Sequence, residues 1–237
     1  MTVLDANEVP LRLDRAMTWP ESHYYGVYPA TVSNNQDPAN QGRVQIHLPW
    51  SPDAASGVYE VWARLATTMA GGQRGTWFIP EVGDEVLVSF LGGDPKWPYV
   101  IGALWNGQDQ PPVTIDANND IRSITSRSGI RITMDDTAGA VTLTLSTPGG
   151  QAVTLADGGP SVTVSDSNGN SIKMDASGMT ITAAAQLTIN APTANINIGS
   201  VTANSAMWTY SGVIQTDTII AAAVVGTTYS PGVGNFL

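Results

Sequence analysis

Two histidines and a short run of acids are the side chains of this chain that could carry out catalysis. His23 and His47 are the only histidines. Glu81, Asp84 and Glu85 stand close together, and a pair of carboxylates is the machinery of glycoside hydrolysis. These residues therefore raise the possibility of a sugar-cleaving site in the first half of the chain.

The local sequence favours a structural role for these residues. PEVGDEV, residues 80–86, is typical of a turn that enters a strand, with Gly83 free to take a positive φ. His47 lies inside the alternating segment RVQIHL, where a packed or surface histidine is expected. The chain contains neither a Gly-x-Ser-x-Gly elbow nor a His-Glu-x-x-His pair. We therefore predict no catalytic, cofactor or metal site, and a protein that is not an enzyme.

Tryptophans offer a second kind of chemistry, because their rings can stack on bases or sugars. Six of the seven stand in the first half, and five of these lie in its predicted barrel, at positions 50, 62, 77, 97 and 105. The alternative is that they fill a β-barrel and its contact with a neighbouring subunit, since aromatic side chains bury large areas. We favour packing and keep a glycan-binding surface as the rival.

Charge and apolar runs exclude several classes of protein. The net charge of −10 argues against nucleic acid, whose phosphates require clustered Lys and Arg. The absence of Cys excludes disulfide and thiolate chemistry. Residues 1–20 carry Asp5, Glu8 and Arg12 among other charges, so we expect no signal peptide. The longest apolar run, 219–226, is far shorter than the roughly 20 residues of a membrane helix.

A change of composition near Pro111-Pro112 predicts two domains. Six of the seven Trp residues precede this pair, and Lys173 is the only basic residue after Arg131. The first half contains five alternating segments separated by Gly- and Pro-rich turns, which is typical of an OB-fold barrel. The expected strands are 25–32, 43–48, 61–66, 84–90 and 99–105.

The second half is a repeat of short strands. Apolar pairs recur every 7 to 12 residues, with turn sequences such as TPGG and DSNGN between them. The pairs are Ile130/Ile132, Val141/Leu143, Val153/Leu155, Val162/Val164, Ile172/Met174, Met179/Ile181, Leu187/Ile189 and Ile196/Ile198. The segment 179–198 carries Thr, Gln and Asn on its polar positions and no charge at all.

Each repeat supplies too few apolar side chains to enclose a core alone. Three chains wound together would solve this, with strands pairing between chains and apolar residues filling a narrow prism. A monomeric β-sandwich or solenoid with a Thr-rich surface is the alternative. The residues alone leave both possibilities open.

Three segments of the first half share a family likeness: residues 74–107, RGTWFIPEVGDEVLVSFLGGDPKWPYVIGALWNG, together with GRVQIHLPW and VWARLATTMAGG. They resemble the OB-fold of contractile-tail spike proteins. That family includes phage baseplate assembly protein V, the T-even tail spike and the valine-glycine-repeat proteins of type VI secretion. The likeness covers roughly residues 24–112. The ending YSPGVGNFL is similar to the end of several family spikes.

The resemblance implies an all-β homotrimer, with an OB-fold barrel followed by an intertwined triple-stranded β-helix. The expected parts are an arm at 1–22, the barrel at 23–112, the shaft at 113–228 and an apex at 229–237. The implied function is that of a central spike that pierces a cell envelope mechanically. The rival function is a trimeric fibre or adhesin that binds glycan through the barrel.

The family also implies partners and a location. Only about 23 residues precede the expected barrel, so we expect the baseplate hub to be a separate protein that contacts the arm. A PAAR-like tip protein is expected on the apex, target membrane is contacted transiently, and nucleic acid is not bound. The expected location is a virion baseplate or a phage-like injection particle, assembled in the bacterial cytoplasm.

Two sets of interface residues follow from these expectations. The predicted tip-protein interface consists of Tyr229, Pro231, Gly232, Gly234, Asn235, Phe236 and Leu237. The predicted trimer core consists of Ile130, Ile132, Val141, Leu143, Ile181, Leu187 and Ile189.

Overall fold

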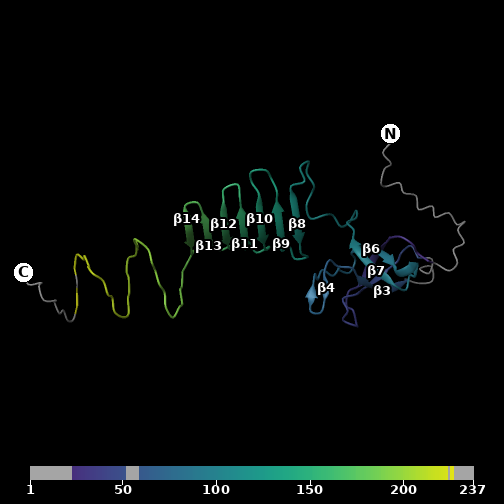
Figure 1. Cartoon of the computed structure of the whole chain (residues 1–237), viewed down its shortest axis with the longest axis horizontal. Coiled ribbons are helices and arrows are strands. Elements are labelled where there is room, and N and C mark those ends of the chain that lie inside the picture. Colours follow the sequence, from purple (N-terminus) through teal and green to yellow (C-terminus); the bar gives the residue numbers. More distant parts are fainter. Residues whose placement is uncertain (1–22, 52–58, 224, 227–237) are drawn as a thin grey trace, which may run out of the picture. The chain divides into compact units, whose positions relative to one another are not determined.

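A computed structural model describes residues 23–51, 59–223 and 225–226. The predicted arm at 1–22 and the tip-protein interface at 229–237 lie outside these residues. Contacts along the chain divide it into two units, Met1–Ala185 and Gln186–Leu237. The regular elements of the described residues are strands, apart from one short 3-10 turn, η2 (Leu91–Gly93). The expected all-β class is confirmed (Figure 1).

The first half folds into a closed barrel with the strand order β1-β2-β3-β7-β6. The strands are β1 (Tyr28–Asn34), β2 (Val44–His47), β3 (Glu60–Leu65), β6 (Glu85–Phe90) and β7 (Pro98–Ala103). All neighbours are antiparallel except β3 and β7, which are parallel. Each strand overlaps one of the five expected from the sequence, so the OB-type barrel is confirmed.

Alternation along the barrel strands places one row of side chains inside. Ile46 and Val44 of β2 and Val86 and Val88 of β6 are fully buried, while their neighbours in sequence are only half-buried. This period of two is what one buried sheet face requires. All ten buried hydrophobic side chains of the described residues belong to the barrel half.

AGGQRG, between β3 and β6, forms a small hairpin of β4 (Ala70–Gly71) and β5 (Arg74–Gly75). Gly75 has a φ of 157°, and a Cβ there would stand 2.6 Å from the Met69 carbonyl oxygen. The turn therefore needs glycine for steric space, because any side chain would meet backbone.

The second half forms one seven-stranded sheet in which every strand pairs with its neighbour in sequence. The strands are β8 (Ile121–Thr125), β9 (Arg131–Asp135), β10 (Thr142–Ser146), β11 (Ala152–Ala156), β12 (Ser161–Ser165), β13 (Ser171–Asp175) and β14 (Gly178–Thr182). All six pairings are antiparallel (Figure 1). β8 was not foreseen from the sequence.

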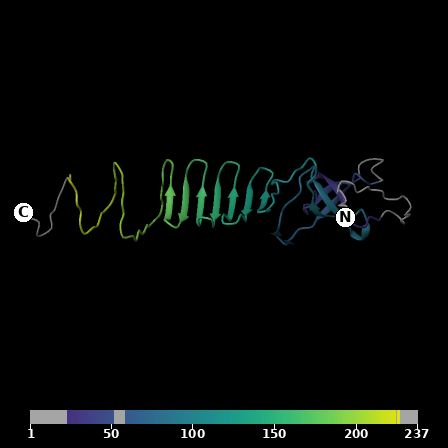
Figure 2. The ribbon, with the colours of Figure 1, turned by 90° about the horizontal axis from the view of Figure 1, so that it is seen from above.

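The pairing within one chain corrects the expectation that each repeat strand finds its partners in other chains. In residues 121–182 the partners come from the same chain, because short turns reverse its direction after each strand. After Ala185 the described residues contain no strand. They run as an extended zigzag (Figures 1 and 2).

Candidate functional site

One face of the β8–β14 sheet carries two parallel rows of apolar side chains, here called the apolar ladders. Cross-strand pairing sets these side chains opposite one another from strand to strand. The first ladder is Ile124, Ile132, Leu145, Val153, Val164, Ile172 and Ile181. The second is Met134, Leu143, Leu155, Val162, Met174 and Met179, with Arg122 opposite Met134 at its head.

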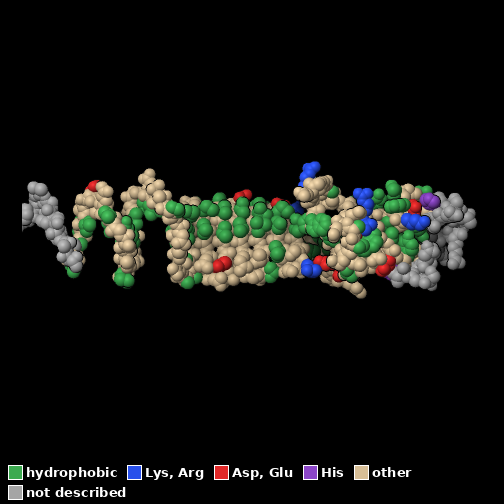
Figure 3. Space-filling view, turned by 90° about the horizontal axis from the view of Figure 1, so that it is seen from below, with side chains coloured by type: hydrophobic (Ala, Val, Ile, Leu, Met, Phe, Trp, Pro, Cys, Tyr) green, Lys and Arg blue, Asp and Glu red, His purple; other side chains and the backbone are tan. Residues whose placement is uncertain are grey.

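Among the residues that the structure describes, none covers the apolar ladders. The exposed fraction is 37% for Ile132 and 66% for Met179, and none of the described residues from 121 onward is buried. Side chains of this size are normally removed from water in a folded domain. The resulting band of hydrophobic surface is visible along the sheet in Figure 3. A contiguous apolar surface of this extent marks an interaction site.

The opposite face of the same sheet is mainly polar, and its charged residues are Arg131, Asp135, Lys173 and Asp175. Its central row is Ser123, Thr133, Thr144, Thr154, Thr163, Lys173 and Thr180. Lys173 is paired with Asp175, whose Oδ2 lies 2.8 Å from the ammonium nitrogen. Threonine suits a strand and bonds water through its hydroxyl. The sheet therefore has one face for water and one face for a partner.

Carboxylates at the turns are occupied by hydrogen bonds from nearby residues. Asp166 accepts from the side chain and backbone of Asn170 and from those of Asn168, and these bonds lower its pKa to about 2. The Lys173 ammonium, followed by Ser177, holds the pKa of Asp175 well below its ordinary value. Thr137 lowers the pKa of Asp135. These acids shape turns.

The acids once considered as a glycosidase pair are engaged in the same way. Asp84 accepts a hydrogen bond from the Glu81 backbone at 2.9 Å, and Gly83 between them has a φ of 102°. The Glu85 carboxylate accepts from the Asn106 side chain at 3.1 Å. In the part of the chain that the structure describes, no cluster of three or more His, Asp or Glu could hold a metal ion.

The tryptophans divide into packed and exposed groups. The Trp50 ring stacks on Tyr28 and meets Tyr24 and Phe90 edge-on, and its indole N–H donates to the Pro29 carbonyl. The half-buried Trp62 lies beneath the Arg43 guanidinium, 5.5 Å from its carbon. In contrast, Trp77, Trp97 and Trp105 are 74%, 62% and 70% exposed. Filling of the barrel therefore accounts for the first group only.

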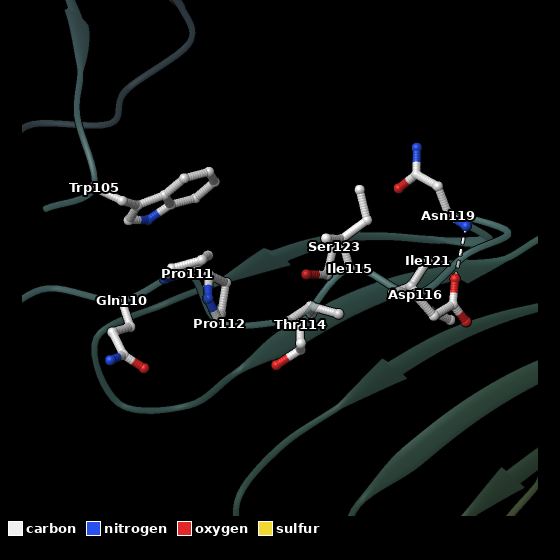
Figure 4. A pocket seen from close by; sticks show the side chains of 11 residues that line it. Trp105, Gln110, Pro111, Pro112, Thr114, Ile115, Asp116, Asn119, Ile121 and Ser123 are labelled. Atoms are coloured by element: carbon white, nitrogen blue, oxygen red, sulfur yellow. Dashed lines mark hydrogen bonds between the residues drawn. The ribbon is translucent and has the colours of Figure 1, made fainter. Parts of the chain in front are cut away.

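Trp105 also borders a pocket of about 590 Å³ at the end of β7 (Figure 4). Pro111, Pro112 and Ile115 contribute to its walls. Asp116 closes the turn behind it by accepting hydrogen bonds from the backbone N–H groups of Asn118 and Asn119, at 3.0 and 2.7 Å. The pocket is mainly apolar and contains no pair of groups arranged for catalysis.

The structure distributes the predicted trimer-core residues unevenly. Ile132, Leu143 and Ile181 belong to the apolar ladders. Ile130 and Val141 precede their strands by one residue, and Leu187 and Ile189 follow the sheet. Ile124 and Leu145 were not predicted from the sequence, although Leu145 follows Leu143 in the alternating pattern of β10 and could have been identified from it. Their place in a trimer stays a prediction.

Two family models match the chain. The type VI secretion system/phage-baseplate injector OB domain matches residues 28–105, and the phage baseplate V C-terminal trimerisation domain matches residues 142–202. The first covers the barrel and the second runs from β10 to beyond β14. Together they confirm the resemblance noted in the sequence.

Curated relatives agree with these matches. The type VI secretion system spike protein VgrG3 of Vibrio cholerae is 40% identical over 77 residues, which are 32% of this chain and 8% of that protein. VgrG1b of Pseudomonas aeruginosa, also a type VI secretion system spike protein, is 32% identical over 121 residues, 47% of this chain and 16% of that protein. The chain therefore spans less than a fifth of these relatives.

Proposed function

We propose, from the premise that this chain belongs to the family of phage-baseplate and type VI secretion spike proteins, that it is the central spike of a contractile injection machine. Three copies would form the spike, with their barrels on a separate hub protein. Contraction of the machine would drive the shaft through the envelope of a target cell. The function is mechanical, without catalysis, a cofactor or nucleic acid.

The apolar ladders are the observation that carries this proposal. They lie on a sheet without buried residues, and residues 142–182 of that sheet fall within the matched trimerisation domain. Three such sheets, each turning its ladders inward, would enclose a common apolar core. Removal of apolar surface from water is worth roughly 25 cal/mol per Å², so a core of this length would be the main source of stability in the shaft.

The polar face supports the mechanical role. Around the common core it would form the outer surface of the shaft, where threonine hydroxyls bind water without the strong hydration of charges. No helix among the described residues has the length and hydropathy to cross a bilayer. Contact with the target membrane is therefore proposed as transient passage.

Substitution on the two faces of β14 tests the trimer. Ile181→Asp would place three unpaired carboxylates in the common core and should abolish the trimer in sedimentation and native mass spectrometry. Thr180→Asp, one residue away on the polar face, is the matched control and should remain trimeric. A folded monomer formed by the unmodified chain would refute the proposal.

At the far end of the spike, we propose that residues 229–237 hold a PAAR-like tip protein and that the chain binds no metal there. This part rests on the sequence, since these residues lie outside those described. Deletion of 229–237 should abolish co-purification of the tip protein with the trimer. Undiminished capture would contradict the assignment, and stoichiometric iron or zinc in the purified trimer would contradict the absence of metal.

The three exposed tryptophans support one rival function, that of a glycan-binding fibre. Trp77, Trp97 and Trp105 present rings to solvent in the single chain. A glycan array separates the two functions. Selective binding that is lost on replacing the three residues by Ala would favour the adhesin, whereas no binding by the intact trimer would favour the spike.

A further inference from the structure

The two edges of the β8–β14 sheet carry opposite charges along the first four strands. Arg127 and Arg131 lie on the edge where β8 turns into β9, here called the basic edge. Asp135, Asp136 and Asp157 lie where β9 and β11 end, here called the acidic edge. β9 itself begins with Arg131 and ends with Asp135. One copy of the chain therefore has a positive side and a negative side at the same level of the sheet.

Arg131 has no ionic partner among the described residues. Arg122 binds Asp136 at 2.9 Å and Arg127 binds Glu81 at 3.0 Å, whereas Arg131 joins none of the ion pairs found there. Its side chain is exposed on the polar face of the sheet. A guanidinium offers five donors in a fork that matches a carboxylate, so this cation is available to a second molecule.

Asp135, at the other end of the same strand, has one oxygen without a donor among the described residues. The backbone N–H and the hydroxyl of Thr137 both donate to Asp135 Oδ1, at 2.9 and 2.6 Å, and leave Oδ2 open. The hydroxyl bond, followed by the backbone bond, lowers the pKa of Asp135, so the group is ionised at neutral pH. Within one chain, four steps of about 3.3 Å keep Arg131 too far away to reach it.

A cavity of about 320 Å³ lies on the apolar face beside the acidic edge. Its lining includes Met134, Leu143 and Leu155 of the second apolar ladder, together with Val141. Asp136 and Asp157 of the acidic edge also line it. The cavity is therefore suited to an apolar side chain that enters from beyond this edge.

The proposed trimer brings the two edges together. Three sheets that turn their ladders inward close a ring, in which the basic edge of each copy meets the acidic edge of the next. With the symmetry axis along the direction in which the strands stack, each strand begins beside the end of the same strand in the next copy. Arg131 then faces Asp135 of the next copy on the outside of the corner. Ile130, which is 53% exposed and falls on the side of Ile132 in the alternation, faces the cavity on the inside.

We propose that Ile130 and Arg131 of each copy form a clasp on the acidic edge of the next copy, with Ile130 in the cavity and Arg131 on Asp135. Three such clasps close the three corners of the shaft beside β9. Because like-charged edges repel, the clasp also favours the ring in which every copy points the same way round. The inference rests on the proposed trimer and names the side chains that close its corners.

A zero-length cross-linker tests the charged half of the clasp in the full-length protein. In Arg131→Lys, a water-soluble carbodiimide can join the introduced amine to a carboxylate that it contacts. We expect covalent dimers and trimers on denaturing gels, with the peptide containing residue 131 joined to the peptide containing Asp135. Arg131→Lys/Asp135→Asn should lose most of this product. The unmodified chain, with Lys96 and Lys173 as its lysines, reports the background.

Cysteines test the apolar half, because the native chain has none. Ile130→Cys/Val141→Cys places one thiol on the basic edge and one in the lining of the cavity. Oxidation should join different copies, since the length of a strand separates the two positions within one chain. Each single variant has one thiol per chain and should give no covalent trimer.

Exchange of the charges tests whether their attraction matters. Arg131→Asp places two negative groups at each corner and should lower the Tm of the trimer by roughly 5 °C. Arg131→Asp/Asp135→Arg restores opposite charges and should melt above either single variant. Thr144→Asp, at the centre of the polar face, is the control and should change Tm by less than about 2 °C. In roughly 1 M salt, where the screening length is about 3 Å, the differences among the clasp variants should shrink.

Each outcome decides the inference. An intact trimer of Arg131→Lys that gives no cross-link between chains would overturn the clasp, and so would oxidised Ile130→Cys/Val141→Cys that stays monomeric on denaturing gels. A charge-exchanged protein that melts below both single variants would contradict the pairing of Arg131 with Asp135. A monomeric unmodified chain in native mass spectrometry would instead count against the proposed function.

Discussion

The Asp37 carboxylate holds the Arg43 guanidinium, with Arg43 Nη2 2.7 Å from Asp37 Oδ1. The same carboxylate accepts from the backbone N–H groups of Ala39, Gln41 and Arg43. The bond from the Arg43 side chain is the main cause that holds the Asp37 pKa well below its ordinary value. One side chain thus organises the whole loop between β1 and β2.

Asp37→Asn should therefore destabilise the barrel. The amide keeps the shape of the carboxylate but loses the charge, and one of its two oxygen acceptors becomes a donor facing other donors. We expect a fall in Tm of roughly 5 °C for the barrel transition in calorimetry. Glu60→Gln removes a charge from an exposed position on β3 and should leave Tm unchanged. Equal Tm values for the two variants would contradict the role of Asp37.

The low pKa of Asp166 predicts acid sensitivity of the sheet. Its folded pKa of about 2 lies below the ordinary value of 3.8, so its bonds stabilise the fold above about pH 4. This contribution is lost as pH falls from about 4 through 2. Asp166→Asn should flatten the dependence of Tm on pH in that window. An NMR titration that places the Asp166 pKa near 3.8 would contradict the prediction.

Alternation in the sequence was enough to identify the barrel. Segments such as RVQIHL and DEVLVSF have a period of two, and their inner residues Val44, Ile46, Val86 and Val88 are buried within the same chain. The positive φ of Gly83 was also predicted from local sequence, because this glycine lies in the turn that enters a strand. Local signals suffice where a domain covers its own core.

The shaft shows where local signals are insufficient. Met179/Ile181 and Leu187/Ile189 have the same pattern, but only the first pair lies in a strand of the sheet. Alternation predicts that a segment forms a strand, but it does not identify the strand with which that segment pairs. Within the sheet the partner is set by the preceding turn, such as 166–170, where Gly169 has a φ of 88°. The partners of charged residues depend on the fold in the same way. Arg64 lies over the Tyr99 ring, and neither Arg64 nor Arg74 joins an ion pair among the described residues.

Trp50 should be the most important tryptophan for barrel stability. Its ring lies 4.6 Å from that of Tyr28 between centroids, and its N–H donates to the Pro29 carbonyl. Trp50→Ala should cost about 2–3 kcal/mol in urea unfolding, somewhat less than a fully buried tryptophan because the residue is half-buried. Trp97→Ala, at an exposed position, should cost less than about 0.5 kcal/mol in the single chain. A loss for Trp97→Ala as large as that for Trp50→Ala would contradict this ranking.

Two adjacent glycines in the turn between β11 and β12 offer a sharp test of how the turns stack. A Cβ on Gly158 would stand 2.4 Å from the Gly139 carbonyl oxygen and 2.9 Å from the Ala140 Cα. Both atoms belong to the turn between β9 and β10, which lies at the same end of the strands. A Cβ on Gly159 would meet nothing within 4 Å. Neither glycine has a positive φ, so backbone strain does not separate the two positions.

Gly158→Ala should therefore destabilise the shaft by about 1–3 kcal/mol, because backbone on both sides must move apart. Gly159→Ala should be neutral or slightly stabilising, since it only reduces the freedom of the unfolded chain. Thermal unfolding of the two variants side by side decides the matter, and equal stability would show that the two turns do not press against each other.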